Sequence, residues 1–101
     1  MRLRPENTIA ICIDFQEKLM PSINEAEAVL DKAAMLVKGL RVLGVPVVVT
    51  QQYTKGLGMT EPSIMEAAGT EEYIDKIAFT AYDSVKWKLR GKKFVIVCGI
   101  E

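Results

Sequence analysis

Histidine is missing from this sequence, and cysteine occurs only twice. Without histidine, the chain has no Ser-His-Asp or Cys-His nucleophile pair, no histidine metal ligand and no histidine general base. The two cysteines lie far apart, so they form neither a disulfide framework nor a zinc site with closely spaced ligands. Any chemistry therefore depends on Asp, Glu, Lys, Tyr or Cys. A reducing compartment, the cytoplasm, is the expected location.

An excess of charge and long apolar segments are also lacking. The 101 residues carry 13 basic and 13 acidic side chains, for a formal net charge of +0. This balance gives no overall attraction to nucleic acid or to an anionic bilayer. The longest uncharged run, residues 42–54, contains a proline and is too short to span a membrane. We therefore expect no nucleic acid and no membrane among the partners.

What is present is a succession of strongly apolar segments. Three of them are typical of strands that are buried on both faces, as in a parallel sheet: Thr8–Asp14, Val45–Gln51 and Lys93–Cys98. Between the first two, apolar residues recur with a period of 3.6 and predict a helix over residues 26–43. Ser22 with Glu25, or Asn24 with Glu27, would form its capping box. Strand, helix and strand in this order predict a right-handed βαβ unit.

The remaining segments are shorter. Residues 54–69 predict loops with one helical turn at Ser63–Ala68. Ile77–Ala81 predicts a short strand and Tyr82–Arg90 an amphipathic helix. The alternation predicts an α/β fold, a doubly wound open parallel sheet with helices on both faces.

The last predicted strand lies at the very end of the sequence. A buried parallel strand needs a neighbour on each edge and helices on both faces. The chain stops with Gly-Ile-Glu at residues 99–101, directly after such a strand. We therefore expect residues 1–101 to be a single domain whose carboxyl-terminal part is missing.

Asp14 is the first candidate for chemistry because it ends the first apolar run. In open α/β sheets, ligands bind beyond the carboxyl ends of the strands. A partly desolvated carboxylate at that place is suited to general-base catalysis. An Asp in this position also caps the following turn in many proteins, and spacing alone does not separate the two interpretations.

Two further polar residues are candidates at the same edge. Gln16 follows Asp14 by two residues; it either orients a side chain or caps a turn, and substrate binding is its predicted functional role. Lys76 precedes the short strand expected at Ile77–Ala81 and can reach inward from a loop. Taken alone, however, a solvated surface lysine is the commoner case.

Two other features are interpreted as structural. The Lys-Gly-Leu-Gly segment at residues 55–58 lacks the spacing of a P-loop and of a dinucleotide fingerprint, so it predicts a turn. Cys12 and Cys98 fall within strands and are predicted to be inert core thiols.

Three segments together resemble the isochorismatase-like cysteine hydrolases. They are Ile-Cys-Ile-Asp-Phe-Gln-Glu-Lys-Leu at residues 11–19, Pro-Val-Val-Val-Thr-Gln-Gln-Tyr-Thr-Lys-Gly-Leu-Gly at residues 46–58, and Val-Cys-Gly-Ile-Glu at residues 97–101. The resemblance runs in order along essentially the whole chain. It implies a six-stranded parallel sheet with helices on both faces. It also implies hydrolysis of amide, imide or related bonds in a small-molecule substrate, and assembly into a homo-oligomer.

The family's catalytic residues are an aspartate at the end of strand one, a lysine before a short third strand and a cysteine after strand four. Asp14 matches the aspartate, and Lys76, in Lys-Ile-Ala-Phe-Thr-Ala-Tyr, matches the lysine. The family's cysteine lies a few residues beyond Gly-Ile-Glu, and neither Cys12 nor Cys98 occupies that position. The resemblance implies that a thiolate attacks a carbonyl, with Asp14 as general base and Lys76 as thiolate stabiliser.

Departures from the family pattern narrow the subgroup and leave alternatives. Relatives that hydrolyse nicotinamide carry an Asp/His metal site after strand two, where this chain has Gln51-Gln52-Tyr53; we expect no metal and no cofactor. Other relatives lack the cysteine and hydrolyse the vinyl ether of isochorismate, which would need Asp14 to be protonated. A further alternative is an inactive truncated or split scaffold that acts by oligomerisation.

Overall fold

A computed structural model describes residues 2–77 and 81–100 of the chain. Four strands form one sheet: β1 (Thr8–Ile13), β2 (Val47–Gln52), β3 (Ile74–Lys76) and β4 (Phe94–Gly99). The α-helices are α1 (Ala26–Val42), α2 (Thr54–Leu57), α3 (Pro62–Ala68) and α4 (Tyr82–Val85). Three 3-10 turns accompany them: η1 (Pro5–Asn7), η2 (Met20–Ser22) and η3 (Lys86–Leu89).

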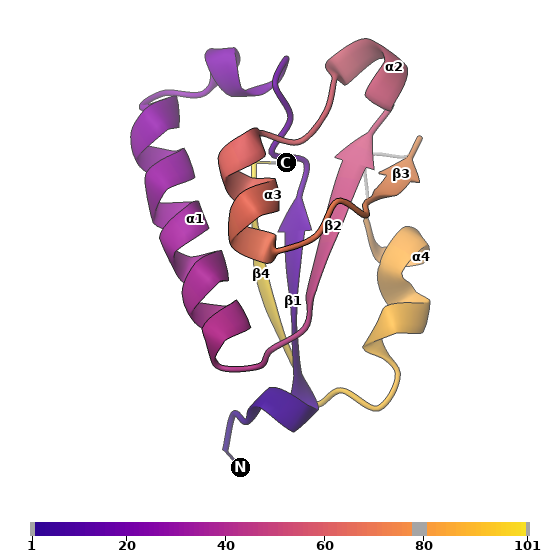
Figure 1. Cartoon of the computed structure of the whole chain (residues 1–101). Coiled ribbons are helices and arrows are strands. Elements are labelled where there is room, and N and C mark those ends of the chain that lie inside the picture. Colours follow the sequence, from indigo (N-terminus) through magenta and orange to yellow (C-terminus); the bar gives the residue numbers. More distant parts are fainter. Residues whose placement is uncertain (1, 78–80, 101) are drawn as a thin grey trace.

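The sheet is parallel throughout, and its strands lie in the order β3-β2-β1-β4 (Figure 1). β1 is central because its run of buried apolar residues can be covered on both faces. It pairs with β2 on one side and with the whole length of β4 on the other. The predicted fold class, a parallel α/β sheet with doubly wound order, is confirmed.

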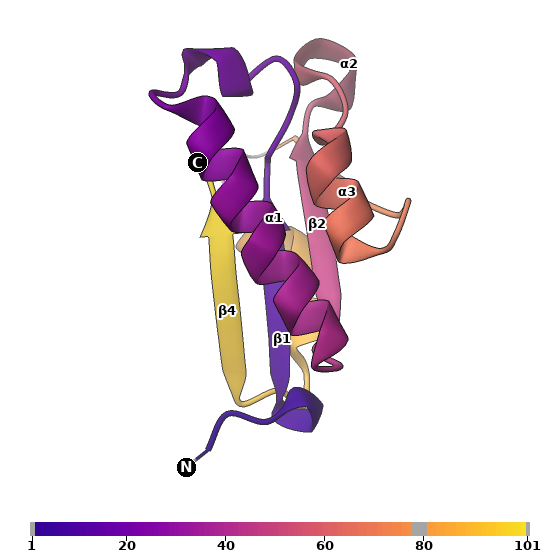
Figure 2. The same cartoon turned by 60° about the vertical axis from the view of Figure 1, so that its left-hand side comes forward.

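The core lies between the sheet and the pair formed by α1 and α3, which pack against each other in front of it (Figure 2). Cys12 and Val49 point from the sheet into this layer, where they meet Val37 of α1 and Ile64 of α3. The apolar stripe predicted for the first helix is confirmed in part: Ala33 and Val37 are buried, whereas Leu36 and Leu43, which the period also placed on it, are 43% and 66% exposed. No helix in the described part of the chain combines the length and the apolar character that crossing a membrane requires.

Several local predictions are corrected. α1 begins without either capping box, because its N-cap residue Glu25 has φ 55° and its side chain makes no capping bond. Ser22 lies in η2 instead. The helix expected over Tyr82–Arg90 is divided into α4 and η3, and the Lys-Gly-Leu-Gly turn lies largely within a short helix, α2.

The short third strand also differs from its prediction. It was expected at Ile77–Ala81, but β3 occupies Ile74–Lys76, and residues 78–80 of the expected strand lie outside the described residues. β3 pairs with the polar end of β2, where Thr50 pairs with Ile74 and Gln52 with Lys76. This register makes Lys76 part of a strand rather than of the loop before it.

Candidate active site

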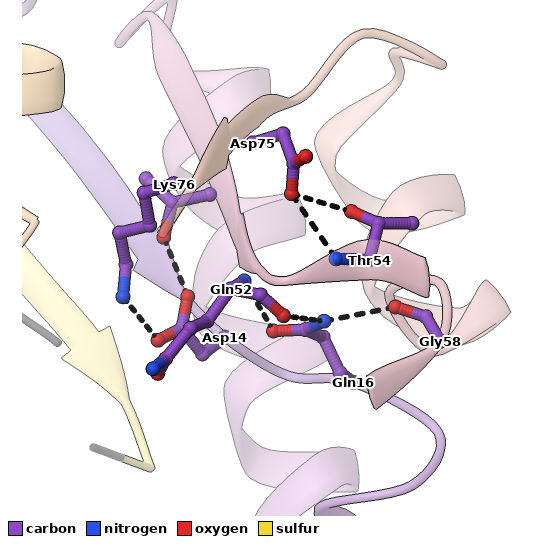
Figure 3. A network of polar contacts seen from close by, with 8 residues as sticks. Asp14, Gln16, Gln52, Thr54, Gly58, Asp75 and Lys76 are labelled. Atoms are coloured by element: carbon purple, nitrogen blue, oxygen red, sulfur yellow. Dashed lines mark hydrogen bonds and ion pairs between the residues drawn. The ribbon is translucent and has the colours of Figure 1, made fainter. Parts of the chain in front are cut away.

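A buried ion pair lies at the carboxyl edge of the sheet, the edge at which open α/β sheets bind ligands (Figure 3). Nζ of Lys76 is 2.7 Å from Oδ2 of Asp14, and the two side chains are 1% and 0% exposed. Thr50 donates a hydrogen bond from its Oγ1 to Oδ1 of Asp14 at 3.0 Å. Both carboxylate oxygens are therefore engaged, and the two predicted catalytic residues lie in contact with each other.

A left-handed turn at Asp14 makes this contact possible. Side chains alternate along a strand, so a straight continuation of β1 would put Asp14 on the face of Cys12, beside α1. Thr50 and Lys76 lie on the opposite face, as their register with Ile13 and Gln52 requires. Asp14 has φ 58°, a value that non-glycine residues rarely adopt, and its carboxylate reaches that opposite face.

Gln16 holds the loops around this pair. Its Nε2 donates to the carbonyl oxygens of Gln52 at 2.9 Å and Gly58 at 2.8 Å. Its Oε1 accepts the backbone N–H of Gln52 at 2.6 Å. The side chain is fully buried and connects the segment after β1 to both ends of α2. All three bonds reach backbone atoms, so among the described residues the structure shows no side chain that Gln16 orients by hydrogen bonding; substrate binding by this residue stays a prediction.

Gln51 and Gln52 end β2 on opposite faces, and sequence reasoning assigned neither a role. The carboxamide of Gln51 is fully bonded: its Oε1 accepts from the backbone and hydroxyl of Thr60, and its Nε2 donates to Thr54. The side chain of Gln52 lies on the face of Thr50 and Lys76. Its Oε1 is buried and has no hydrogen-bond partner among the described residues. A polar ending to an apolar strand was the only sequence signal for these two residues.

The two cysteines lie away from the ion pair. They are register partners on β1 and β4, their Sγ atoms are 3.8 Å apart, and both contact the core beside α1. The hydrogen bond with Cys98 and its own burial raise the pKa of the Cys12 thiol. The same hydrogen bond lowers the pKa of Cys98, although burial opposes it. Neither thiol faces Asp14, which agrees with their prediction as core residues.

The arrangement can move a proton and stabilise an anion. The carboxylate of Asp14 is hydrogen-bonded by Lys76 and by the hydroxyl of Thr50 instead of by bulk water. A carboxylate in such a place can accept a proton from a nucleophile and return it to a leaving group. The ammonium beside it favours a neighbouring anion. No three Cys, Asp or Glu side chains of residues 2–77 and 81–100 converge in a way that could hold a metal ion. The absence of a metal from the working site stays a prediction.

Comparison with known proteins gives the family of the chain. Residues 8–101 match the model of the isochorismatase domain. Isochorismatase domain-containing protein 2A of Mus musculus is 36% identical, over 99% of this chain and 49% of the mouse protein. Isochorismatase domain-containing protein 2 of Danio rerio is 34% identical, over 99% of this chain and 52% of the fish protein. The chain thus spans about half the length of the curated relatives it matches.

Solved structures share the fold. The MAR1 ribonuclease of Caenorhabditis elegans superposes with a TM-score of 0.88 at 32% identity, over 100% of this chain and 54% of that one. The YcaC gene product of Escherichia coli, described as an octameric hydrolase of unknown specificity, has a TM-score of 0.83 at 22% identity, over 98% of this chain and 52% of its own. Because the family match covers residues 8–101 and the parallel sheet is the same, this chain belongs to the isochorismatase domain family.

Proposed function

We propose that Asp14 and Lys76 are two catalytic residues of a hydrolase that cleaves amide, imide or related bonds in small molecules. The observation that carries this proposal is their ion pair, which is fully buried at the ligand-binding edge of the sheet. The third group is a cysteine thiol outside residues 1–101, because Cys12 and Cys98 both face the core.

The proposed reaction divides into acylation and hydrolysis. The thiol gives its proton to Asp14, and its sulfur attacks the substrate carbonyl while Lys76 stabilises the thiolate. The C–N bond breaks as Asp14 returns the proton to the leaving nitrogen, which leaves a thioester. Water then attacks the thioester and gives a proton to Asp14. As the C–S bond breaks, Asp14 returns this proton to the leaving sulfur, which releases the acid and restores the free thiol.

The first experiment is the intact mass of the protein as purified from its source, under denaturing conditions. A mass well above 11.2 kDa supports a longer chain that carries the thiol. A mass of 11.2 kDa excludes thioester chemistry within one chain and favours the second candidate, a scaffold that acts by oligomerisation. The free edge of β4 in the described residues is the observation that favours that candidate.

Turnover provides the second test, on the protein at its natural length. We expect hydrolysis of small amides, measured as released amine or ammonia, and of small imides, measured as the carboxylic acid formed. Iodoacetamide should abolish both activities. Asp14→Asn lowers kcat/KM by about 10²–10⁴-fold, because general acid–base catalysis contributes that much. Asp75→Asn is the matched control, since this carboxylate neighbours Lys76 but accepts its hydrogen bonds from Thr54 instead.

The outcomes separate the alternatives. Full activity of Asp14→Asn would contradict the proposed roles. Hydrolysis of an isochorismate-like vinyl ether that depends on Asp14 and resists iodoacetamide would favour the alternative in which Asp14 is the acid. RNA cleavage serves as a counter-assay, since the similar worm structure is described as a ribonuclease. The balanced charge of this chain favours a small-molecule substrate.

A further inference from the structure

Gln52 has a buried polar atom that the folded chain leaves unused. Nearly all buried polar atoms in proteins have a hydrogen-bond partner, so each exception calls for an explanation. Among the described residues, Oε1 of Gln52 is the one buried side-chain oxygen or nitrogen without a partner. The carboxamide oxygens of the two nearby glutamines, Gln16 and Gln51, each accept at least one hydrogen bond. The unused oxygen is therefore particular to position 52 and not general to this part of the sheet.

The place of Gln52 connects it to the ion pair. Gln52 pairs in register with Lys76, and Thr50 lies two residues earlier on the same face of β2. Both of these neighbours contact Asp14 directly. In Figure 3 the Gln52 side chain extends to the same side as Asp14 and Lys76. The side chain of Gln16 fixes the backbone of Gln52, because it accepts a hydrogen bond from the N–H of Gln52 and donates one to the carbonyl oxygen of Gln52.

The backbone of Gln52 is thus fixed by hydrogen bonds, whereas its side-chain oxygen makes none among the described residues. The residue as a whole is half-buried, although its Oε1 is buried in this conformation. The terminal torsion of glutamine is broad and roughly two-fold, so the group can turn toward an incoming donor. A fixed backbone with an unused carboxamide is the arrangement expected of a group that bonds a substrate.

We propose that Gln52 selects the substrate by pairing its carboxamide with an N–H group and a carbonyl oxygen of a neutral amide or imide. Its Oε1 accepts the substrate N–H, and its Nε2 donates to the substrate carbonyl. The charges of Asp14 and Lys76 balance each other, so the site has no excess charge to attract an ionic substrate. This inference rests on the proposed function for the place of the site, and it narrows the substrate to one that carries an N–H group.

Binding of two imides tests the inference without turnover. The protein at its natural length is titrated with succinimide and with N-methylsuccinimide, which has the same ring but no N–H. We expect succinimide to bind about tenfold more tightly, as one additional hydrogen bond implies. Gln52→Met removes this preference. Gln51→Met, the matched control on the opposite face, keeps it in protein that circular dichroism shows to be folded.

Three binding results would overturn the proposed role of Gln52. Equal affinity of the wild type for the two imides, as a water-filled site would give, overturns the inference, and so does the absence of binding by either. A preference that survives in Gln52→Met also overturns it. The proposed function fails on a different readout, the turnover of Asp14→Asn, so the two results are distinguishable.

Discussion

The side chains of Asp14 and Lys76 are buried together, so each of the two opposite charges is compensated by the other. Removal of one partner leaves an uncompensated buried charge, which costs about 3–5 kcal/mol. Lys76→Met should therefore lower the free energy of unfolding by about that amount, measured by urea denaturation. The double variant D14N/K76M should recover much of the loss because no buried charge remains. Additive losses would contradict the coupling.

Replacement of Gln52 should change the free energy of unfolding in the opposite direction. An unpaired buried polar atom costs about 1–3 kcal/mol, and Met of similar shape has no such atom. Gln52→Met should therefore raise the free energy of unfolding by about 1 kcal/mol, whereas Gln51→Met should lower it by about 1–3 kcal/mol because it breaks a bonded network. Thermal and urea unfolding of both variants measure the difference. Loss of stability in Gln52→Met would show that this side chain serves the fold.

At the scale of elements, the end of β4 lies unusually close to the end of β1. A Cβ atom on Gly99 would lie 2.6 Å from the carbonyl oxygen of Ile13 and 2.7 Å from its Cβ. These are backbone and branched side-chain atoms that cannot move aside, so Gly99→Ala should cost about 1–3 kcal/mol and loosen the last β1–β4 pair. Hydrogen exchange of the amides at the end of β1 measures the loosening.

Gly39→Ala is the matched control for that substitution. A Cβ atom on Gly39 meets nothing within 4 Å, and the residue lies inside α1. Alanine is the better helix former by roughly 0.5–1 kcal/mol, so this variant should be more stable than the wild type. If both variants are destabilised to the same extent, crowding at Gly99 is not the cause.

Sequence reasoning succeeded for elements whose own residues determine their structure. Apolar runs located β1, β2 and β4, helical spacing located α1, and the family resemblance assigned roles to Asp14 and Lys76, which the structure brings into contact. It failed where the position of an element depends on pairing with a strand far away in the sequence. β3 is set by its register with β2, not by its own apolar content. The contact of Thr50 with Asp14 arises only where the left-handed turn at Asp14 brings β2 and the end of β1 together.

At the scale of the whole molecule, the sheet has one long free edge within the described residues, that of β4. Val95 and Val97 of this strand are 41% and 59% exposed on the face away from α1. Free apolar edges promote strand-to-strand association, and lysines prevent it. A protein of these 101 residues should therefore self-associate, and the variant V95K/V97K should do so less, as measured by sedimentation equilibrium.

Val42→Lys is the control for the edge variant. Val42 is 76% exposed at the end of α1, away from the sheet edge. This substitution adds a lysine without changing β4, so association should stay as in the wild type. A strictly monomeric wild-type chain of 101 residues would contradict the prediction.

The strand order β3-β2-β1-β4 also determines when the molecule can fold during synthesis. β1 is made first and finds β2 after one helix, which is a short-range event in the sequence. Its other neighbour, β4, is made only after α3, β3 and α4, although the two strands pair along six residues. Long-range pairing of this kind is slow because a large loop must close first. One edge of β1 therefore stays unpaired until nearly all of these 101 residues have been translated.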